Sequence, residues 1–403
     1  MKKVIYIFFL LFFTGLPCVF GQKKEISQAK EFVKRKNNLE KAEQLMRDLL
    51  KDSANQHNEK IWELLSSALL GQYYQANEKL YLKQQIDTAT LFLPFQKLYH
   101  VYIHVDSMEM IPNKQGNVKP KYRKEHSETI HRYRPNLYNG GIYFFTKEKY
   151  AEAYSFFDDY ITSANEPLMI AYRYNEQDTL IPRAAYWAVA CGYMMKDTQK
   201  TLHHTYQALK DTAHFMKMLQ YLAETYRLDG DTVRYEATLQ EGFQKYPVQP
   251  YFFTQLNLLY SLQGNWEKAL ALAEQAFQFS SNRQSASFAK AQALFHLGKY
   301  KQSIAICDTL IREDSTFADA YLCAGISYYN QAIDFDKQMQ RSKKIKNQIQ
   351  ENYQQALRYL GTYRRMCPDK KESWLQPLYT IYLNLNMGKE FDEINNIMKD
   401  GNK

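Results

Sequence analysis

One unit of 34 residues occurs four times between Phe215 and Pro368, and it constrains the fold more than any other feature of the 403-residue chain. Equivalent positions recur at this spacing in several columns: Ala223, Asn257, Ala291 and Gly325; Tyr226, Tyr260, Leu294 and Tyr328; and the turn glycines Gly230, Gly264 and Gly298. A fixed period of this length is typical of a helical array in which each unit buries its apolar face against the next. The sequence therefore predicts an all-α fold of antiparallel helix pairs.

The clearest copy begins with Phe253-Thr-Gln-Leu-Asn-Leu-Leu-Tyr260 and continues with Gly264-Asn-Trp-Glu-Lys-Ala269, Ala273 and Ala276. This order of a bulky residue, a small one, an aromatic one and an alanine-rich second helix resembles the tetratricopeptide repeat (TPR). Glycine supplies the left-handed backbone that ends the first helix. The resemblance implies a right-handed superhelical solenoid whose long concave surface serves binding.

The layout of the whole chain is also similar to uncharacterised exported TPR proteins of Gram-negative bacteria. The segments that carry this resemblance are Asn77-Glu-Lys-Leu-Tyr-Leu-Lys-Gln, Arg134-Pro-Asn-Leu, Asn139-Gly-Gly and Pro377-Leu-Tyr-Thr-Ile-Tyr-Leu-Asn-Leu-Asn. The resemblance implies an envelope location and no particular activity.

Residues 1–21 have the pattern of a secretory signal peptide. Lys2 and Lys3 precede an apolar run from Val4 to Phe13 that is too short for a stable membrane span, and Gly21 offers a small residue at the expected cut, before Gln22. An uncleaved anchor and lipid modification of Cys18 are the alternatives, although Thr14-Gly-Leu-Pro17 is a poor lipoprotein site. We expect an exported, periplasmic protein.

The predicted export of the protein limits the partners that its positive net charge could attract. Loss of the two signal lysines lowers the formal net charge from +9 to +7. An exported protein is not expected to meet nucleic acid, so anionic envelope surfaces or an acidic protein are more plausible partners. Simple colloidal solubility explains the charge equally well.

The rest of the chain divides by its pattern. After the signal we expect irregular helical repeats at 22–110, a loop and basic helix at 111–136, divergent repeats at 137–214, the regular array at 215–368 and capping helices at 369–403. The last regular unit is interrupted, because Gly325 and Ala356 lie 31 residues apart instead of 12. The extra residues, about 334–350, contain good helix formers and neither Gly nor Pro, which predicts a projecting extension of both helices.

Basic side chains concentrate between Pro112 and Pro135, a stretch that contains seven Lys or Arg residues and two Glu residues. A solvated helix face, a docking site for an acidic partner and a contact with anionic polymer or lipid all fit this composition. The predicted basic patch comprises Lys119, Lys121, Arg123, Lys124, Arg132 and Arg134.

Motifs of catalysis and metal binding are missing from the sequence, which contains no G-x-x-x-x-G-K-[ST] loop, H-E-x-x-H pair or G-x-S-x-G elbow. His100 and His104 share a predicted helix face but have no third ligand, and the adjacent His203 and His204 are expected to point apart. The sequence predicts no catalytic residue, metal or cofactor.

Four cysteines follow the signal, at 191, 307, 323 and 367, without metal-ligand spacing. Cys307 and Cys323 fall on neighbouring helices, where an exported protein could form a disulfide. Ordinary buried thiols are the favoured interpretation.

These observations predict a non-enzymatic envelope scaffold that binds a protein or peptide on the concave face of its solenoid. Some TPR modules hold a peptide carboxylate with Lys, Asn and Arg, but the equivalent faces here offer residues such as Tyr251, Gln255 and Phe288, so that ligand is not carried over. The alternative is a structural protein whose basic helices, including a Lys337–Lys346 arm, rest on anionic cell-wall polymer or lipid. The predicted partner-binding residues are Gln220, Glu224, Arg227, Tyr251, Thr254, Leu258, Phe288, Gln292, Phe295, Leu322, Ile326 and Tyr329.

Overall fold

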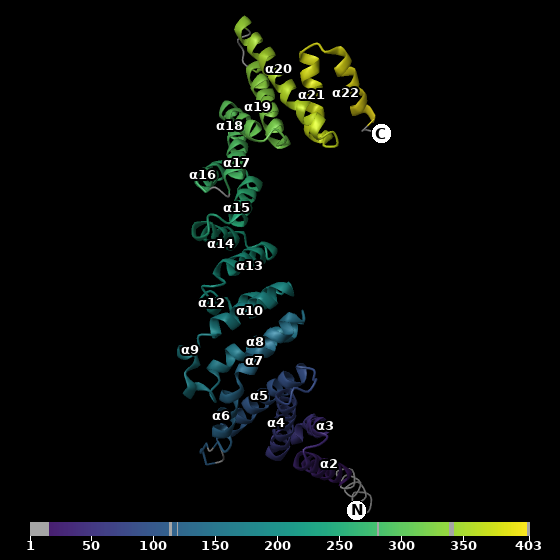
Figure 1. Ribbon diagram of the computed structural model, residues 1–403, viewed down its shortest axis with the longest axis vertical. Helices are drawn as coiled ribbons and strands as arrows, with labels where there is room; N and C mark the ends of the chain where they lie inside the picture. Colours follow the sequence, from purple (N-terminus) through teal and green to yellow (C-terminus); the bar gives the residue numbers. More distant parts are fainter. Residues whose placement is uncertain (1–15, 113–114, 119, 280–281, 338–341, 401–403) are drawn as a thin grey trace, which may run out of the picture. The chain divides into compact units, whose positions relative to one another are not determined.

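The computed structural model describes residues 16–112, 115–118, 120–279, 282–337 and 342–400, and every long element in these ranges is an α-helix. The chain forms two compact units, residues 1–225 (unit 1) and 226–403 (unit 2), each of which is described by itself. Consecutive helices pack as antiparallel neighbours within each unit (Figure 1). The predicted all-α class and its helix pairs are therefore confirmed.

Unit 1 opens with two pairs of contacting helices and then becomes irregular. Helices α3 to α4, α4 to α5, α5 to α7, α7 to α8 and α8 to α10 are neighbours. The second half of its last pair is split into two short helices, α11 and α12. The bounds are α2 Leu16–Arg35, α3 Leu39–Leu50, α4 Glu59–Tyr81, α5 Ala89–Glu109, α6 Arg123–Tyr133, α7 Pro135–Thr146, α8 Tyr150–Thr162, α9 Tyr174–Gln177, α10 Ile181–Met194, α11 Thr198–His203 and α12 Thr205–Ala208, with one-turn 3₁₀ segments at Ser53–Asn55, Ser163–Asn165 and Ile170–Tyr172.

Helix α13, Phe215–Leu228, contains the division between the units, and unit 2 continues with the regular pairs. Each helix of unit 2 packs on the next, and the first helices α17, α19 and α21 also contact one another in turn. The bounds are α14 Thr232–Lys245, α15 Pro250–Leu262, α16 Trp266–Ala276, α17 Arg283–His296, α18 Tyr300–Glu313, α19 Ala318–Asp336, α20 Lys343–Met366, α21 Lys371–Asn384 and α22 Gly388–Asp400.

The turns of the regular pairs follow from their glycines. Gly230, Gly264 and Gly298 have φ values of 75°, 66° and 71°. The next residue then donates its backbone N–H to a carbonyl one turn back, as Asn265 does to Tyr260 at 2.9 Å. Asn265 also caps the following helix by accepting the Lys268 N–H at 3.2 Å. At Gly230 and Gly264, the glycine and the Asp or Asn after it thus end one helix and begin the next.

The interrupted repeat is built as the sequence predicts. Helix α19 has 19 residues and α20 has 24, against 14 in each of α17 and α18. Tyr353, Ala356, Leu360 and Tyr363 of α20 are buried against α19 and α21. The insertion therefore lengthens both helices, and residues 338–341 between them lie outside the described ranges.

Helix α5 ends at Glu109, next to the predicted boundary at 110, and the basic helix within 111–136 begins at Arg123. Helix α2 begins at Leu16 and runs through the expected cut before Gln22, whereas most of the predicted signal lies outside the described residues. None of the described helices is both long enough and apolar enough to cross a bilayer.

Candidate functional site

A pocket of about 470 Å³ opens in unit 1 between α4, α5 and α6. Its interior is apolar and aromatic, with Leu70, Val105 and Met108 beside the rings of Trp62 and Tyr102. Its acidic side chains are Glu59, Glu63, Glu109 and Glu125. The sequence does not predict this pocket, because its walls come from three separate stretches, residues 57–70, 102–111 and 122–126, that no repeat spacing connects.

His126 forms part of the pocket wall. Its imidazole is stacked between Tyr102, with ring centroids 3.7 Å apart, and Tyr122, with centroids 5.5 Å apart. The residue is only 7% exposed, and burial lowers the pKa of its imidazole to about 4. Its Nδ1 atom is buried without a hydrogen-bond partner. At neutral pH His126 therefore places an uncharged aromatic ring in the pocket wall.

Three cationic side chains lie near the carboxylates of the pocket or beside its walls. Glu109 accepts the backbone N–H of Tyr122 at 3.2 Å. The Lys121 ammonium donates to the Tyr122 hydroxyl, and this hydrogen bond raises the pKa of the ammonium, to which the charges of Glu63 and Glu59 add. Arg123 lies 3.3 Å from Asp106 on α5, and Lys124 is exposed. The exposed Glu59, Glu63 and Glu125 keep the mouth of the pocket acidic.

The predicted basic patch does not form one surface. Arg134 is 3% exposed, donates to Ser163 Oγ and to the Tyr160 carbonyl at 2.8 Å each, and pairs with Asp178. Its guanidinium lies 3.8 Å from the Tyr160 ring centroid and 4.0 Å from that of Tyr174. The expectation that Arg134 faces a partner is therefore wrong, because a buried and paired cation cannot reach one. Lys119 lies outside the described residues, and Arg132 is exposed.

The predicted partner face is mostly packed surface. Gln220 and Glu224 of α13 are half-buried in unit 1, whereas Arg227 and the other residues of the set lie in unit 2. Phe288 packs on Phe317 with centroids 5.0 Å apart, and Phe295 packs on Tyr300 at 5.8 Å. Leu322, Ile326 and Tyr329 lie against the core that α20 and α21 share.

An exposed row remains on α15 and α17. Arg227 of α13, Thr254 and Leu258 of α15 and Gln292 of α17 are exposed, with 48% of Leu258 accessible, and Tyr251 is half-buried. Partner contacts on this face are therefore expected from Thr254, Leu258 and Gln292 rather than from the phenylalanines.

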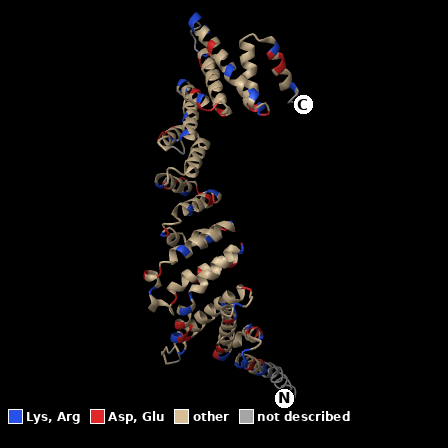
Figure 2. Cartoon of the chain, viewed as in Figure 1, with Lys and Arg blue, Asp and Glu red and all other residues tan. Residues whose placement is uncertain are grey.

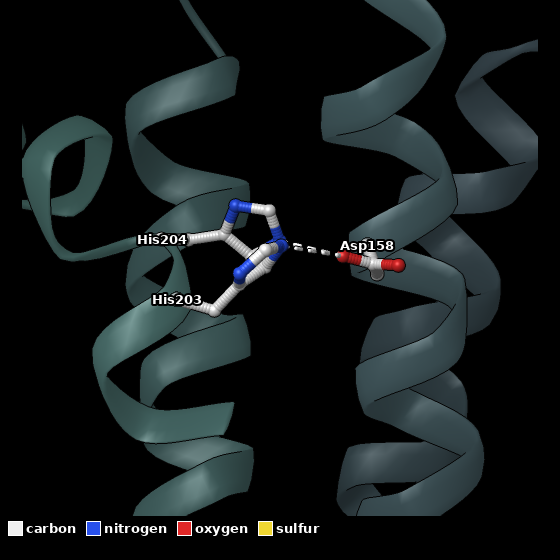
Figure 3. Close-up of side chains that lie close together, drawn as sticks. All are labelled: Asp158, His203 and His204. Atoms are coloured by element: carbon white, nitrogen blue, oxygen red, sulfur yellow. Dashed lines mark hydrogen bonds and ion pairs between the residues drawn. The ribbon is translucent and has the colours of Figure 1, made fainter. Parts of the chain in front are cut away.

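The two histidine pairs singled out in the sequence are arranged differently from the prediction. His100 Nε2 lies 3.1 Å from Asp159, a hydrogen bond that raises the pKa of the imidazole, whereas the His104 ring contacts Trp62 with centroids 4.4 Å apart. These two histidines share no ligand position. His203 and His204, expected to diverge, instead converge on Asp158 of α8 (Figure 3).

All four cysteines in the described side chains are free thiols, as favoured from the sequence. Cys307 is buried and Cys323 half-buried. A hydrogen bond between the two thiols and burial raise the pKa of Cys307. Ser303 Oγ lies 3.5 Å from Cys323 Sγ.

Comparisons with known proteins concern the repeats. Residues 262–334 match the family model of anaphase-promoting complex, cyclosome, subunit 3. A comparison with curated protein sequences finds no match. Many solved structures are similar to this chain.

Three of these structures illustrate the similarity. The C-terminal part of a TPR repeat-containing protein from Cytophaga hutchinsonii is 12% identical, covering 64% of this chain and 92% of its own, at a TM-score of 0.44. YrrB, described as a TPR protein with an unusual peptide-binding site, is 16% identical, covering 51% of this chain and 94% of its own, at 0.36. A TPR protein from Parabacteroides merdae is 14% identical, covering 63% and 98%, at 0.35.

No ligand is carried over from these structures. The assignment depends instead on the 34-residue period, the observed helix pairs and the family match to residues 262–334. Together they show an array of tetratricopeptide-like helix pairs, in which the family match itself covers residues 262–334.

Proposed function

We propose that the chain is a non-enzymatic scaffold that binds a segment of a partner protein, with an arginine or lysine side chain of that segment in the pocket of unit 1. One observation carries this proposal: the exposed carboxylates of Glu59, Glu63 and Glu125 line the same pocket as aromatic rings such as those of Trp62 and Tyr102. A guanidinium or ammonium group pairs with these carboxylates. It also gains contact with aromatic faces and with a neutral rather than a charged imidazole.

Charge and size support the same occupant. Glu59, Glu63 and Glu125 surround the mouth, so a basic segment approaches a complementary surface. A volume of about 470 Å³ lies within the usual range of ligand pockets and leaves room beyond a single side chain. The apolar interior accommodates the aliphatic stem, as in other sites where long cationic side chains bury their methylenes.

The exposed row on α15 and α17 is a second surface for the same function. Leu258 supplies an accessible apolar side chain, Thr254 a hydroxyl one helical turn away on α15, and Gln292 an exposed amide on α17. An extended segment uses alternating apolar and polar contacts of this kind. These residues are the exposed members of the set predicted for the concave face.

An envelope location is part of the proposal and depends on residues 1–21, whose charged start and apolar run are those of an export signal. N-terminal sequencing of the chain recovered from a periplasmic fraction is expected to begin at Gln22. A chain that stays in the cytoplasm would contradict export. One recovered with Cys18 as its lipid-modified first residue would replace cleavage before Gln22 by lipoprotein processing.

Contact with anionic polymer through basic helices is the alternative. Figure 2 shows Lys and Arg segments interspersed with Asp and Glu segments along the helices. The exposed lysines of the arm, Lys343, Lys344 and Lys346, remain available to such a surface. Binding of this kind falls steeply with salt, because exposed charges are screened within about 10 Å at 0.1 M ionic strength.

Peptide display against the purified chain tests the pocket. We expect the enriched peptides to contain arginine or lysine, and to lose at least tenfold in affinity for a chain carrying Glu63→Gln and Glu125→Gln. Glu128→Gln is the matched control, since Glu128 is exposed on the same helix α6 and does not line the pocket. Peptides without basic residues, or equal binding by both variants, would refute the pocket.

Cross-linking separates the two surfaces. A photoreactive side chain at position 63 and another at position 258 are each expected to capture a protein in cells. Capture at 258 alone would move the site to α15 and α17. Recovery of cell-wall polymer, reduced by high salt and by Lys343→Ala with Lys344→Ala, would favour the alternative function.

A further inference from the structure

We propose that Asp158, His203 and His204 form a binding site for a divalent transition-metal ion, best matched to Zn²⁺. One ligand atom from each residue lies within 4.8 Å of the others (Figure 3). The site belongs entirely to unit 1, where α8 supplies the aspartate and the end of α11 supplies both histidines. It is separate from the pocket proposed for the partner.

The break between α11 and α12 brings the two histidines together. Asp197 begins α11 by accepting the Lys200 N–H at 3.0 Å, and the helix ends six residues later at His203. His204 has φ −104° and ψ 15°, outside helical values, before α12 restarts at Thr205. In a continuous helix adjacent side chains are about 100° apart around the axis, so the break lets both rings face α8.

Close packing holds α11 in place. A Cβ at Gly192 of α10 would lie 2.4 Å from the backbone nitrogen of Thr201, so only glycine allows α11 to approach α10 this closely. Helix α10 also packs along α8. This shared neighbour places the end of α11 opposite Asp158.

The distances fit an ion after small side-chain rotations. His204 Nε2 lies 2.6 Å and His203 Nε2 3.9 Å from the same oxygen, Asp158 Oδ1. Metal-ligand bonds of 2.0–2.2 Å in tetrahedral geometry require ligand atoms about 3.3 Å apart. The buried His204 is the fixed ligand, with 8% of its side chain exposed, whereas His203 is 60% and Asp158 34% exposed. The two more exposed side chains can adjust around it.

The donor set selects the ion. Two imidazole nitrogens and one carboxylate oxygen suit Zn²⁺, while hard ions such as Mg²⁺ and Ca²⁺ prefer oxygen ligands. The neighbouring cation Lys200 is held 3.2 Å from Asp197 and over the Tyr154 ring, so its charge is partly balanced. Zn²⁺ takes the place of the hydrogen bond between His204 Nε2 and Asp158 Oδ1, with the proton of the neutral imidazole on Nδ1, and the fourth coordination position stays open to water.

The tag-free full-length chain tests the site by titration with ZnCl₂ and by the visible spectrum of bound Co²⁺. We expect one ion per chain, with a tetrahedral Co²⁺ spectrum, and at least a tenfold weaker affinity in Asp158→Asn and in His203→Ala. His57→Ala is the control and keeps full affinity, because His57 is exposed and outside the cluster.

The exposed His203 carries the decisive result, since His204→Ala also removes a buried side chain. Circular dichroism confirms that the His203→Ala chain is folded. Absence of stoichiometric binding would reduce the cluster to a hydrogen-bonded ion pair. Binding that survives both Asp158→Asn and His203→Ala would place the ion elsewhere and overturn the assignment.

Discussion

The regular pairs of unit 2 and the irregular helices of unit 1 use polar side chains in different ways. Among the described residues, the buried polar side chains of unit 2 are Asn282, Ser303 and Ser327, all uncharged. Unit 1 buries charged residues and histidines as well, at positions 43, 106, 126, 134, 159, 204 and 211. The pocket and the His–Asp cluster both lie there.

The difference has a physical origin. In a regular array every helix pair makes the same apolar contacts with the next pair. These contacts bury its apolar face without polar partners from distant parts of the chain. Where the repeat is broken, side chains far apart in sequence meet, and buried polar groups must find partners there. Arg134 reaches Asp178 across 44 residues, and His204 reaches Asp158 across 46. The irregular helix pairs therefore contain the buried charged and histidine side chains of this protein, while the regular pairs form an apolar framework.

The largest expected effect concerns Arg134. Its replacement by alanine leaves Asp178 buried without its cation and opens a space between Tyr160 and Tyr174. Breaking a buried pair of this kind costs about 3–5 kcal/mol. We expect a loss of that size in the free energy of unfolding of unit 1, measured by hydrogen exchange of α7 and α8 in urea.

Arg132→Ala is the control on the same stretch, because Arg132 is exposed. A surface substitution changes stability by less than about 0.5 kcal/mol. Equal losses in the two variants would show that the buried network does not stabilise unit 1.

The sequence predicts the framework far better than the site. Period and turn glycines are local signals, so the helix pairs of 215–368 and the lengthened α19 and α20 follow from them. The partners of a side chain are not a local property, which is why the sequence predicts Arg134 on a basic surface and predicts that His203 and His204 point apart. The single signal for the cluster was Asp197, an N-cap residue that begins a helix too short to pass His204.

The second prediction concerns the pH dependence of unit 1. The pKa of His126 is about 4 in the folded chain and 6.5 in the unfolded one, so the unfolded state binds the extra proton between these values. The contribution of His126 to the free energy of unfolding is fully present above about pH 6.5 and is lost as the pH falls towards 4. The two pKa values correspond to roughly 3 kcal/mol at most.

His126→Phe keeps a ring between Tyr102 and Tyr122 but cannot titrate. Urea unfolding at pH 7, 5.5 and 4.5 is expected to show a shallower pH dependence in the variant. This comparison cancels the other titrating groups, including His100. Parallel curves for the two chains would mean that His126 is not the group responsible.

The third prediction tests how tightly the regular pairs are packed. A Cβ at Gly242 would lie 2.2 Å from the ring of Phe252 on the next helix. Overpacking of this kind costs about 1–3 kcal/mol, so Gly242→Ala should destabilise unit 2 by that amount in urea unfolding. Gly361→Ala is the matched control, because its Cβ meets nothing within 4 Å on helix α20. We expect this control to stabilise by about 0.5–1 kcal/mol, and destabilisation by both would point to helix geometry rather than packing.

The smallest expected effect compares the turns of the two regions directly. Gly264 of unit 2 and Glu148 of unit 1 occupy the same turn position, with φ values of 66° and 58°. In both, the following N–H donates to a carbonyl five residues back, at 2.9 Å in one and 3.0 Å in the other. A left-handed backbone costs a non-glycine residue about 1–2 kcal/mol, which the greater freedom of glycine in the unfolded chain partly offsets. Glu148→Gly should therefore stabilise unit 1 by about 0.5 kcal/mol, and Gly264→Ala should destabilise unit 2 by about as much. Thermal unfolding of both variants measures the two changes, and a loss on Glu148→Gly would show that the glutamate side chain contributes more than its backbone strain removes.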